Sequence, residues 1–135
     1  MSDAAATTPG SIVWHDLTIP DADTLSEFYA SVCGWQRTSL PEHDGDFTMH
    51  RSGESEAVAG VCYARGVNAH IPPQWLMYVA VANLAASLAE TERLGGRCVE
   101  GPRLMGGHHF CVIQDPAGAY IALISPLAVP AINEI

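Results

Sequence analysis

The sequence predicts an α+β fold built from two βαβββ units, and three observations carry this prediction. The stretch from Trp14 to Trp35 recurs in degenerate form as Leu76 to Arg97, 62 residues later. Each copy begins with a short strand, continues with an Asp or Asn suited to cap a helix, and has a glycine after an amphipathic segment. Because cap and glycine recur at the same offset, we interpret the chain as one supersecondary unit used twice.

In the first unit, residues 12–19 alternate between two faces as a half-buried strand does. Pro20 ends this strand, and Asp21 caps a helix that stops at Gly34. Residues spaced i, i+3, i+4 and i+7 give the helix an apolar face that we expect to pack on the sheet. This face consists of Leu25, Phe28, Tyr29 and Val32. Three more strands are predicted at 35–38, 47–51 and 57–64.

The second unit repeats this order. A strand is predicted at 75–82, and Asn83 caps a helix that ends at Gly95 and Gly96. The apolar residues of this helix are Leu84, Leu88 and Leu94. The remaining strands are predicted at 97–100, 110–114 and 119–125, with a loop at 101–109 and a tight turn at 115–118.

The chain has the length of one compact domain. We place this domain at residues 12–125, with its units at 12–65 and 75–125 and a proline-containing linker at 66–74. Residues 1–11 are expected to form a flexible leader. The tail 126–135 is expected to pack loosely or to reach a neighbouring molecule.

The composition and net charge of the chain limit the kinds of binding partner that we expect. Of the 135 residues, 48% are hydrophobic, and 15 acidic residues against 6 basic ones give a net charge of -9. This charge argues against nucleic acid and anionic membranes, whereas a neutral or cationic ligand is compatible with it. With no signal peptide and no membrane-spanning run in the sequence, we expect a cytoplasmic protein. The four cysteines lack CxxC spacing and are predicted to be buried thiols.

Several of these features together resemble the vicinal oxygen chelate superfamily. They are the two βαβββ units, the pair Phe28-Tyr29 ahead of a glycine stop, and the Asp115-Pro-Ala-Gly turn before the last strand. The superfamily includes glyoxalase I, bleomycin-resistance proteins and extradiol dioxygenases. The openings WHDLTIPD and QWLMYVAV are similar to a glyoxalase-like branch of mostly unassigned function. The resemblance implies an eight-stranded mixed sheet that encloses a cavity, formed within one chain or by exchange between chains.

The resemblance also implies four positions for metal ligands, and this chain departs from all of them. Three positions hold Trp14, Leu76 and Ala122, and the fourth lies in the strand 57–64, which has no acidic residue. None supplies a donor suited to a divalent ion, so we predict no metal and no cofactor. His15 is one residue from the first position, but strand alternation turns it toward the helix, where a packing histidine is the other interpretation. A bulge in the strand would be needed to bring it to the cavity.

If the cavity of the superfamily is present, strand parity predicts which residues line it. They are Trp14, Asp16, Thr18, Leu76, Tyr78, Ala80, His108, Phe110, Val112, Tyr120 and Ala122. Asp16 has three interpretations, namely pairing with a ligand cation, general-base catalysis, or a structural hydrogen bond. His108 is the other catalytic candidate, and the alternative is that His108 and His109 are solvated loop residues. The aromatic residues serve either to stack on a ligand or to pack the core.

Three functional hypotheses follow. The first is a metal-free protein of the bleomycin-resistance type that sequesters or carries a small organic ligand, cationic or aromatic. The second is a glyoxalase-like lyase, isomerase or dioxygenase, either metal-dependent or cofactor-independent, so whether the protein is an enzyme stays open. The third is an interaction module whose cavity is filled by its own side chains. Because each half leaves a sheet edge to cover, we also expect a homodimer.

Overall fold

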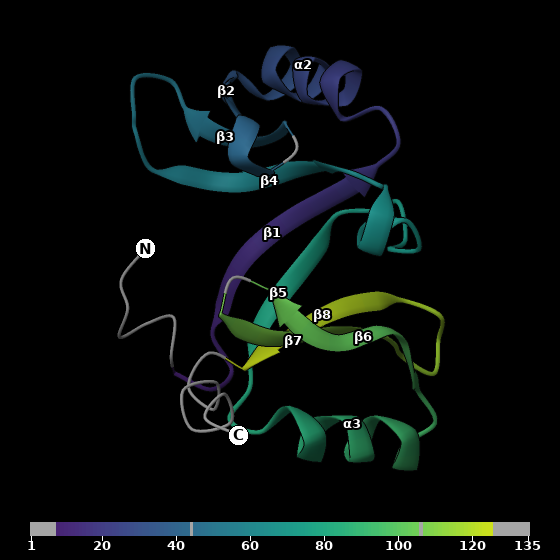
Figure 1. Ribbon diagram of the computed structural model, residues 1–135. Coiled ribbons are helices and arrows are strands. Elements are labelled where there is room, and N and C mark those ends of the chain that lie inside the picture. The colour runs from purple at the N-terminus through teal and green to yellow at the C-terminus, as the bar shows by residue number, and fades with distance from the viewer. Residues whose placement is uncertain (1–7, 44, 106, 126–135) are drawn as a thin grey trace. The chain divides into compact units, whose positions relative to one another are not determined.

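The computed structural model describes residues 8–43, 45–105 and 107–125, and its fold is α+β (Figure 1). Eight strands form a mixed sheet, and two α-helices accompany them. Two compact parts can be distinguished, one comprising residues 14–76 and the other residues 8–13 with 77–125. The predicted succession of strands and helices is confirmed in both. No helix among the described residues is long and apolar enough to cross a membrane.

The first part contains one helix and four strands. These are β1 (Ile12–Ile19), α2 (Ala22–Cys33), β2 (Trp35–Leu40), β3 (Asp46–Arg51) and β4 (Ala57–Tyr63). The strands lie in the order β2-β3-β4-β1, with β1 parallel to β4 and the other pairs antiparallel. Single turns of 3-10 helix occur at Pro41–His43 and at Gly66–Asn68, the latter within the predicted linker.

The boundaries of α2 have the predicted cause. The Asp21 carboxylate accepts a hydrogen bond from the backbone N–H of Thr24 at 3.0 Å, which satisfies one of the free donors of the first turn. At the other end, Gly34 has φ 73°, the left-handed conformation that ends a helix at least cost when the residue is glycine.

The face of α2 that packs on the sheet differs from the predicted one. Its buried residues are the small Ala22 and Ser26, whereas Phe28 and Val32 are 52% and 65% exposed. Arg37 on β2 donates hydrogen bonds to the Ser26 hydroxyl and the Asp23 carboxylate, both at 2.8 Å, and so holds this side of the helix toward the sheet. The predicted apolar face is therefore correct only for Leu25 and Tyr29, which are half-buried.

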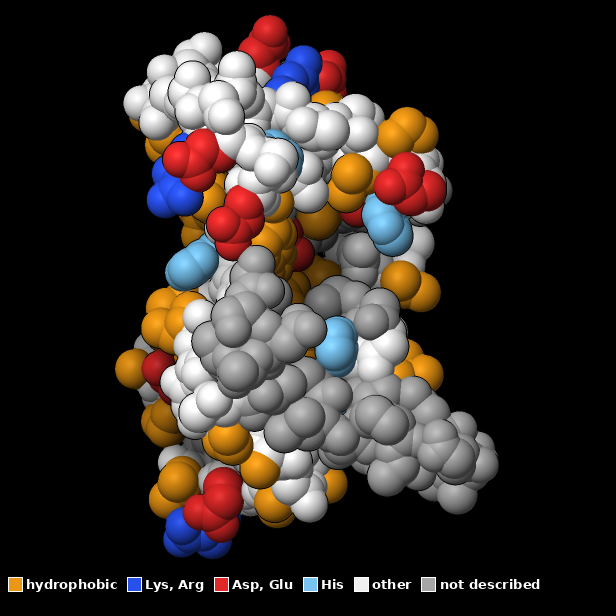
Figure 2. Space-filling model, turned by 90° about the vertical axis from the view of Figure 1, so that its left-hand side faces the viewer, with side chains coloured by type: hydrophobic (Ala, Val, Ile, Leu, Met, Phe, Trp, Pro, Cys, Tyr) orange, Lys and Arg blue, Asp and Glu red, His pale blue; other side chains and the backbone are white. Residues whose placement is uncertain are grey.

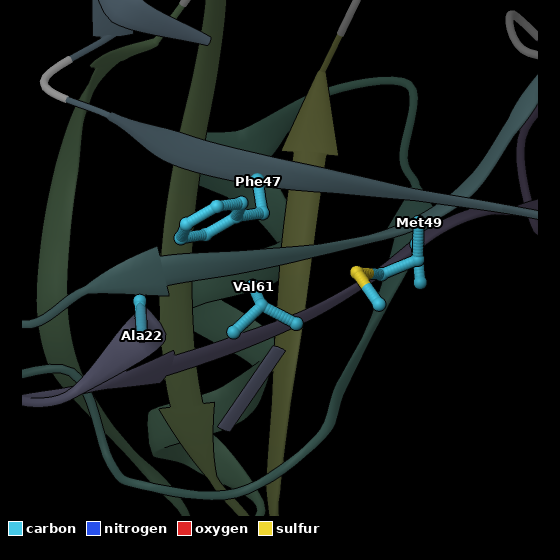
Figure 3. Close-up of a cluster of buried hydrophobic side chains, with 5 residues drawn as sticks. Ala22, Phe47, Met49 and Val61 are labelled. Atoms are coloured by element: carbon cyan, nitrogen blue, oxygen red, sulfur yellow. The ribbon is translucent and has the colours of Figure 1, made fainter. Parts of the chain in front are cut away.

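The core of this part lies between α2 and the sheet (Figure 3). Phe47 and Met49 on β3 alternate with polar residues and point to the same side as Val61 on β4 and Ala22 on α2. Met49 and Val61 are completely buried. Period-two alternation in the strands thus assigns the apolar side chains to the helix side and leaves the polar ones on the opposite face.

The second part repeats the arrangement. It contains β5 (Leu76–Ala80), α3 (Leu84–Arg93), β6 (Arg97–Met105), β7 (His108–Gln114) and β8 (Tyr120–Ser125), with strand order β5-β8-β7-β6. The Asn83 side chain caps α3 by accepting the Ala86 N–H at 3.0 Å. Leu84 and Leu88 pack on the sheet, but the third predicted contact residue, Leu94, follows the helix and is 60% exposed.

β6 is longer than predicted, because most of the expected loop 101–109 is strand. β6 pairs with β7 from Arg97 to Met105, and the register shifts around Glu100 absorb Gly101 (φ 85°) and Pro102. A bulge of this kind lets a strand continue past residues that interrupt a regular ladder. The turn between β7 and β8 is as predicted, since the Asp115 carboxylate accepts the N–H groups of Ala117 and Ala119.

Two ion pairs on the surface join near neighbours in the sequence. Arg51 binds Glu54 and Arg93 binds Glu90, each at 2.6 Å, and all four side chains are largely exposed. On the face shown in Figure 2, the coloured acidic side chains stand singly or beside a basic one rather than gathering in one patch. Exposed pairs of this kind contribute about 0–1 kcal/mol each, so packing carries most of the stability.

Candidate functional site

The sheet face opposite α2 in the first part is polar, and it forms the candidate site. Strand register places Asp16 beside Gly60 and Thr18 beside Cys62, and it pairs Thr48 with Gly60 from the other side. Paired residues project from the same face of a sheet. The predicted parity of β1 is therefore correct, because Asp16 and Thr18 lie on this face and Leu17 lies on the core side.

The Asp16 carboxylate lies directly over Gly60. A Cβ atom at Gly60 would stand 2.5 Å from Asp16 Oδ1 and 3.5 Å from the Trp14 ring, so only glycine leaves room for the carboxylate in this position. Cys62 Sγ donates a hydrogen bond to Asp16 Oδ1 at 3.3 Å. Asp16 is 9% exposed and Thr18 3% exposed, which makes the carboxylate a nearly buried negative group beside an indole ring.

Cys62 is a hydrogen-bond donor and not a nucleophile. Burial raises the pKa of its thiol far above the ordinary range, and the neighbouring carboxylates of Asp16 and Asp46 raise this pKa further. A thiol in such surroundings stays protonated, whereas nucleophilic cysteines need the thiolate. The Cys62 thiol therefore keeps its proton and donates it in the hydrogen bond to Asp16. The sequence analysis did not name Cys62 as a site residue, but the alternation of side chains along β4 could have revealed it.

A second polar pair on this face also escaped the sequence analysis. Thr48 Oγ1 and His50 Nε2 lie 2.8 Å apart on β3, and both side chains are partly buried. They alternate with the core residues Phe47 and Met49. The period-two pattern that predicted the strand could therefore have placed them on the polar face as well. The face thus carries a carboxylate, a thiol, hydroxyl groups and an imidazole.

The positions that the superfamily uses for metal ligands are apolar or aromatic here. Leu76 and Ala122 are buried, Trp14 is half-buried, and β4 contains no acidic residue. Across residues 8–43, 45–105 and 107–125, no three His, Cys, Asp or Glu side chains group in a way that could hold a metal ion. The residues present do not fit a divalent metal at these positions.

His15 does not take either of the roles considered for it. Its neighbours Asp16 and Thr18 lie on the polar face, so His15 points away from that face, and its side chain is exposed. The interpretation as a buried packing histidine is wrong, because the His15 side chain is exposed.

In the second part, the predicted residues Tyr78, Val112 and Ala122 share one sheet face with Phe110. Phe110 and Tyr78 stack with ring centroids 6.0 Å apart, and all four residues are at most 2% exposed. Ala80 is also buried, whereas Tyr120 and His108 are half-buried. The aromatic pair thus packs against itself, which agrees with the core-packing interpretation for these two rings.

Two charged residues also lie on this face, Glu100 from the end of the predicted strand 97–100 and Arg103 from the segment that was predicted to be a loop. The Arg103 guanidinium lies 4.8 Å above the Phe110 ring, and its Nε is 3.4 Å from the Glu100 carboxylate. Both side chains are largely buried, at 22% and 17% exposure. The sequence analysis missed them because a strand interrupted by Gly101 and Pro102 has no regular alternation.

His108 and His109 are separated by the strand that holds them. His108 lies on the Phe110 side of β7, and its Nδ1 atom is buried without a hydrogen-bond partner among the described residues. His109 points to the side of α3. The prediction of a solvated histidine pair in a loop is therefore wrong, since neighbouring residues in a strand project to opposite faces.

Comparisons with known proteins agree with this architecture. The model of the glyoxalase-like domain family matches residues 13–124. Among curated proteins, "Putative glyoxylase CFP32" of Mycobacterium tuberculosis (strain CDC 1551 / Oshkosh) is 29% identical over 118 residues, and the protein of the same name in Mycobacterium bovis matches equally. The match covers 84% of this chain and 45% of the relative, so the chain spans about half the length of these relatives.

Solved structures show the same fold at low identity. The Mn(II)-bound glyoxalase from Novosphingobium aromaticivorans aligns with a TM-score of 0.54 and 17% identity, covering 94% of this chain and 41% of that one. A variant of Streptomyces coelicolor methylmalonyl-CoA epimerase, in complex with 2-nitronate-propionyl-CoA, aligns with a TM-score of 0.51 and 16% identity, covering 90% and 98%. The chain belongs to the glyoxalase-like domain family.

Proposed function

We propose that this protein binds a small organic ligand without a metal ion, and that the Asp16 face of β1, β3 and β4 holds it. The observation that carries the proposal is the Asp16 carboxylate over Gly60, nearly buried and held by the Cys62 thiol. A carboxylate in such a place costs free energy unless charged or hydrogen-bonding partners compensate it. The Cys62 hydrogen bond supplies part of this compensation, and a cationic group of a ligand adds to it.

The surroundings favour a cation with an apolar or aromatic body. The Trp14 ring lies beside the carboxylate and offers an aromatic face, on which ammonium and guanidinium groups are stabilised. Thr18 and the Thr48–His50 pair supply hydroxyl and imidazole groups that orient a ligand by hydrogen bonds. The net charge of -9 favours the approach of a cation over long distances. In this proposal Trp14, Asp16 and Thr18 are ligand-binding residues.

A series of three small probes of one shape tests the charge selectivity. Benzylammonium, benzyl alcohol and benzoate differ in the charge of one group, and thermal shift and calorimetry measure their binding. We expect benzylammonium to bind most tightly and benzoate least tightly, because a buried carboxylate attracts one and repels the other. The Asp16→Asn variant should bind benzylammonium at least tenfold more weakly, because a hydrogen bond to a charged group contributes about 1.5–3 kcal/mol.

The matched control is Asp23→Asn, which makes the same change of charge on the side of the helix. The Asp23 side chain is 65% exposed and pairs with Arg37, so its loss should leave probe affinity unchanged. Equal effects of the two substitutions would show that only net charge matters and would refute a site at Asp16.

An enzyme of the glyoxalase type is the second candidate. The Thr48–His50 pair on the Asp16 face favours it, because acid–base catalysis needs a positioned partner in addition to a carboxylate. A cofactor-independent lyase or isomerase would lose turnover, but not binding, in His50→Gln. Stoichiometric divalent metal in the purified protein, or a large thermal response to added metal ions, would instead support a metal-dependent lyase, isomerase or dioxygenase.

We also propose that the protein forms a homodimer. β2 and β6 stand at the two ends of the strand order, so each has one edge that no other described strand pairs with. Such edges are usually covered or paired. Sedimentation at micromolar concentration tests this proposal, and a monomer as the sole species would contradict it.

A further inference from the structure

An apolar cavity of about 250 Å³ lies between the N-terminal half of α3 and the β7–β8 side of the sheet. It is on the helix side, whereas Phe110 and Ala122 project from the opposite face. All of its lining residues belong to the second part of the chain, whereas the site proposed above lies on β1, β3 and β4 of the first part. The two sites therefore share no residue, and neither depends on the other. The cavity is lined by Asn83, Leu84, Ala85, Leu88, Pro102, His109 and Ser125.

Two polar atoms in the cavity wall have no hydrogen-bond partner among the described residues. Ser125 Oγ and His109 Nδ1 are buried, and neither makes a hydrogen bond to any described residue. Ser125 is only 1% exposed. The two residues are register partners on adjacent antiparallel strands, so both polar groups belong to the same part of the wall. Buried polar groups almost always have a partner, so this pair is available to hydrogen-bond a polar group that enters the cavity.

The helix end adds further donors at the same place. Asn83, Leu84 and Ala85 line the cavity, and they are the cap and the first two residues of α3. The Asn83 side chain accepts a hydrogen bond from the N–H of Ala86. The N–H groups of Leu84 and Ala85 have no acceptor within the helix. The N-terminus of a helix carries a partial positive charge that favours a carboxylate or another anion.

The net negative charge of the protein does not prevent an anion from binding in this cavity. None of the seven lining residues is acidic. At physiological ionic strength the Debye length is about 8 Å, so the surface carboxylates that give the net charge of -9 are largely screened from a partly enclosed site.

We propose that this cavity is a second ligand site that takes a small apolar carboxylic acid. The carboxylate accepts hydrogen bonds from Ser125 Oγ, His109 and the free N–H groups at the start of α3. The apolar body lies against Leu84 and Leu88. An engineered apolar cavity of about 150 Å³ holds benzene, so by proportion this one has room for roughly ten non-hydrogen atoms. Octanoate has that size and is the probe of choice.

Titration of the full chain with octanoate, followed by amide NMR, tests the proposal. We expect saturable shifts at the start of α3 and at the facing ends of β7 and β8, with amides around Asp16 unchanged. 1-Octanol has the same body without the charge, and it should bind at least about tenfold more weakly, since hydrogen bonds to charged groups are the stronger ones. Shifts centred on Asp16, no saturation at about 10 mM octanoate, or equal affinity for the alcohol would each overturn the proposal.

Two substitutions separate binding from stability. Ser125→Ala should weaken octanoate about tenfold and leave the melting temperature of the free protein unchanged or higher, because it removes an unpartnered buried hydroxyl. Ser87→Ala is the matched control, since Ser87 lies on α3 but does not line the cavity. Unchanged octanoate affinity in Ser125→Ala, or an equal loss in Ser87→Ala, would refute the assignment. The probes of the first site should bind normally to both variants.

Discussion

The contact between Gly60 and Asp16 gives the sharpest test of the candidate site. In Gly60→Ala, the new methyl group would stand 2.5 Å from Asp16 Oδ1, whereas ordinary contacts begin at 3.4 Å. The carboxylate must therefore retreat by about 1 Å, yet it accepts a hydrogen bond from the Cys62 thiol. We expect its hydrogen bond to Cys62 to lengthen or break.

The expected loss in the free energy of unfolding follows from two opposing effects. Overpacking of a buried site costs about 1–3 kcal/mol. Replacing glycine by alanine within a strand returns about 0.5–1 kcal/mol, because the unfolded chain loses freedom. The net loss is about 1–2 kcal/mol. With a urea m-value of about 2 kcal/mol/M for a domain of this size, the midpoint of unfolding should fall by roughly 0.5–1 M.

A double-mutant cycle shows whether the carboxylate is the cause. In an Asp16→Ala background the methyl group meets no carboxylate, so Gly60→Ala should there be neutral or stabilising. The coupling free energy should then be at least as large as the net loss, and urea unfolding of the four proteins measures it. If Gly60→Ala lowers the free energy of unfolding equally in both backgrounds, the close approach of Asp16 is not what requires glycine, and the reasoning about this site is refuted.

Three further outcomes are expected. Cys62 should react with iodoacetamide far more slowly than the exposed Cys33, because burial and then the Asp16 carboxylate raise the pKa of its thiol, and Asp16→Asn should speed the reaction. The N–H of Thr24 holds the pKa of the Asp21 carboxyl below its usual range, so the contribution of this cap is present above the unfolded pKa and is lost as pH falls through the lowered value. Urea unfolding between pH 6 and pH 2 (about two units on either side of the usual carboxyl pKa) should show a smaller decline in Asp21→Asn, which keeps the cap but does not titrate. Asn83→Ala should lower the free energy of unfolding by about 1 kcal/mol through loss of its cap, and an unchanged urea midpoint would contradict this role.

Much of the site can be predicted from the chain where the reasoning is local. The alternation of β1 alone assigned Asp16 and Thr18 to one face and Leu17 to the other, and the register confirms this. The same rule applied to β3 and β4 would have added Thr48, His50 and Cys62. Their position on the Asp16 face depends, however, on which strands are neighbours. β1 and β4 are neighbours in the sheet but far apart in the sequence, and hydrophobic periodicity contains no information about their pairing.

The sequence by itself determined the elements whose causes lie within a few residues. The Asp21 and Asn83 caps, the Gly34 stop and the Asp115 turn each satisfy backbone groups close by in the chain, so residue type and spacing suffice to predict them.

Only the tertiary structure decided what depends on partners distant in the chain. The hydrogen bonds of Arg37 determine which face of α2 is buried. Pairing with β7 keeps β6 extended on both sides of Gly101 and Pro102. The absence of a side chain at Gly60 admits the Asp16 carboxylate. In each case the deciding contact joins separate elements, and its free energy outweighs the local preference of a single segment.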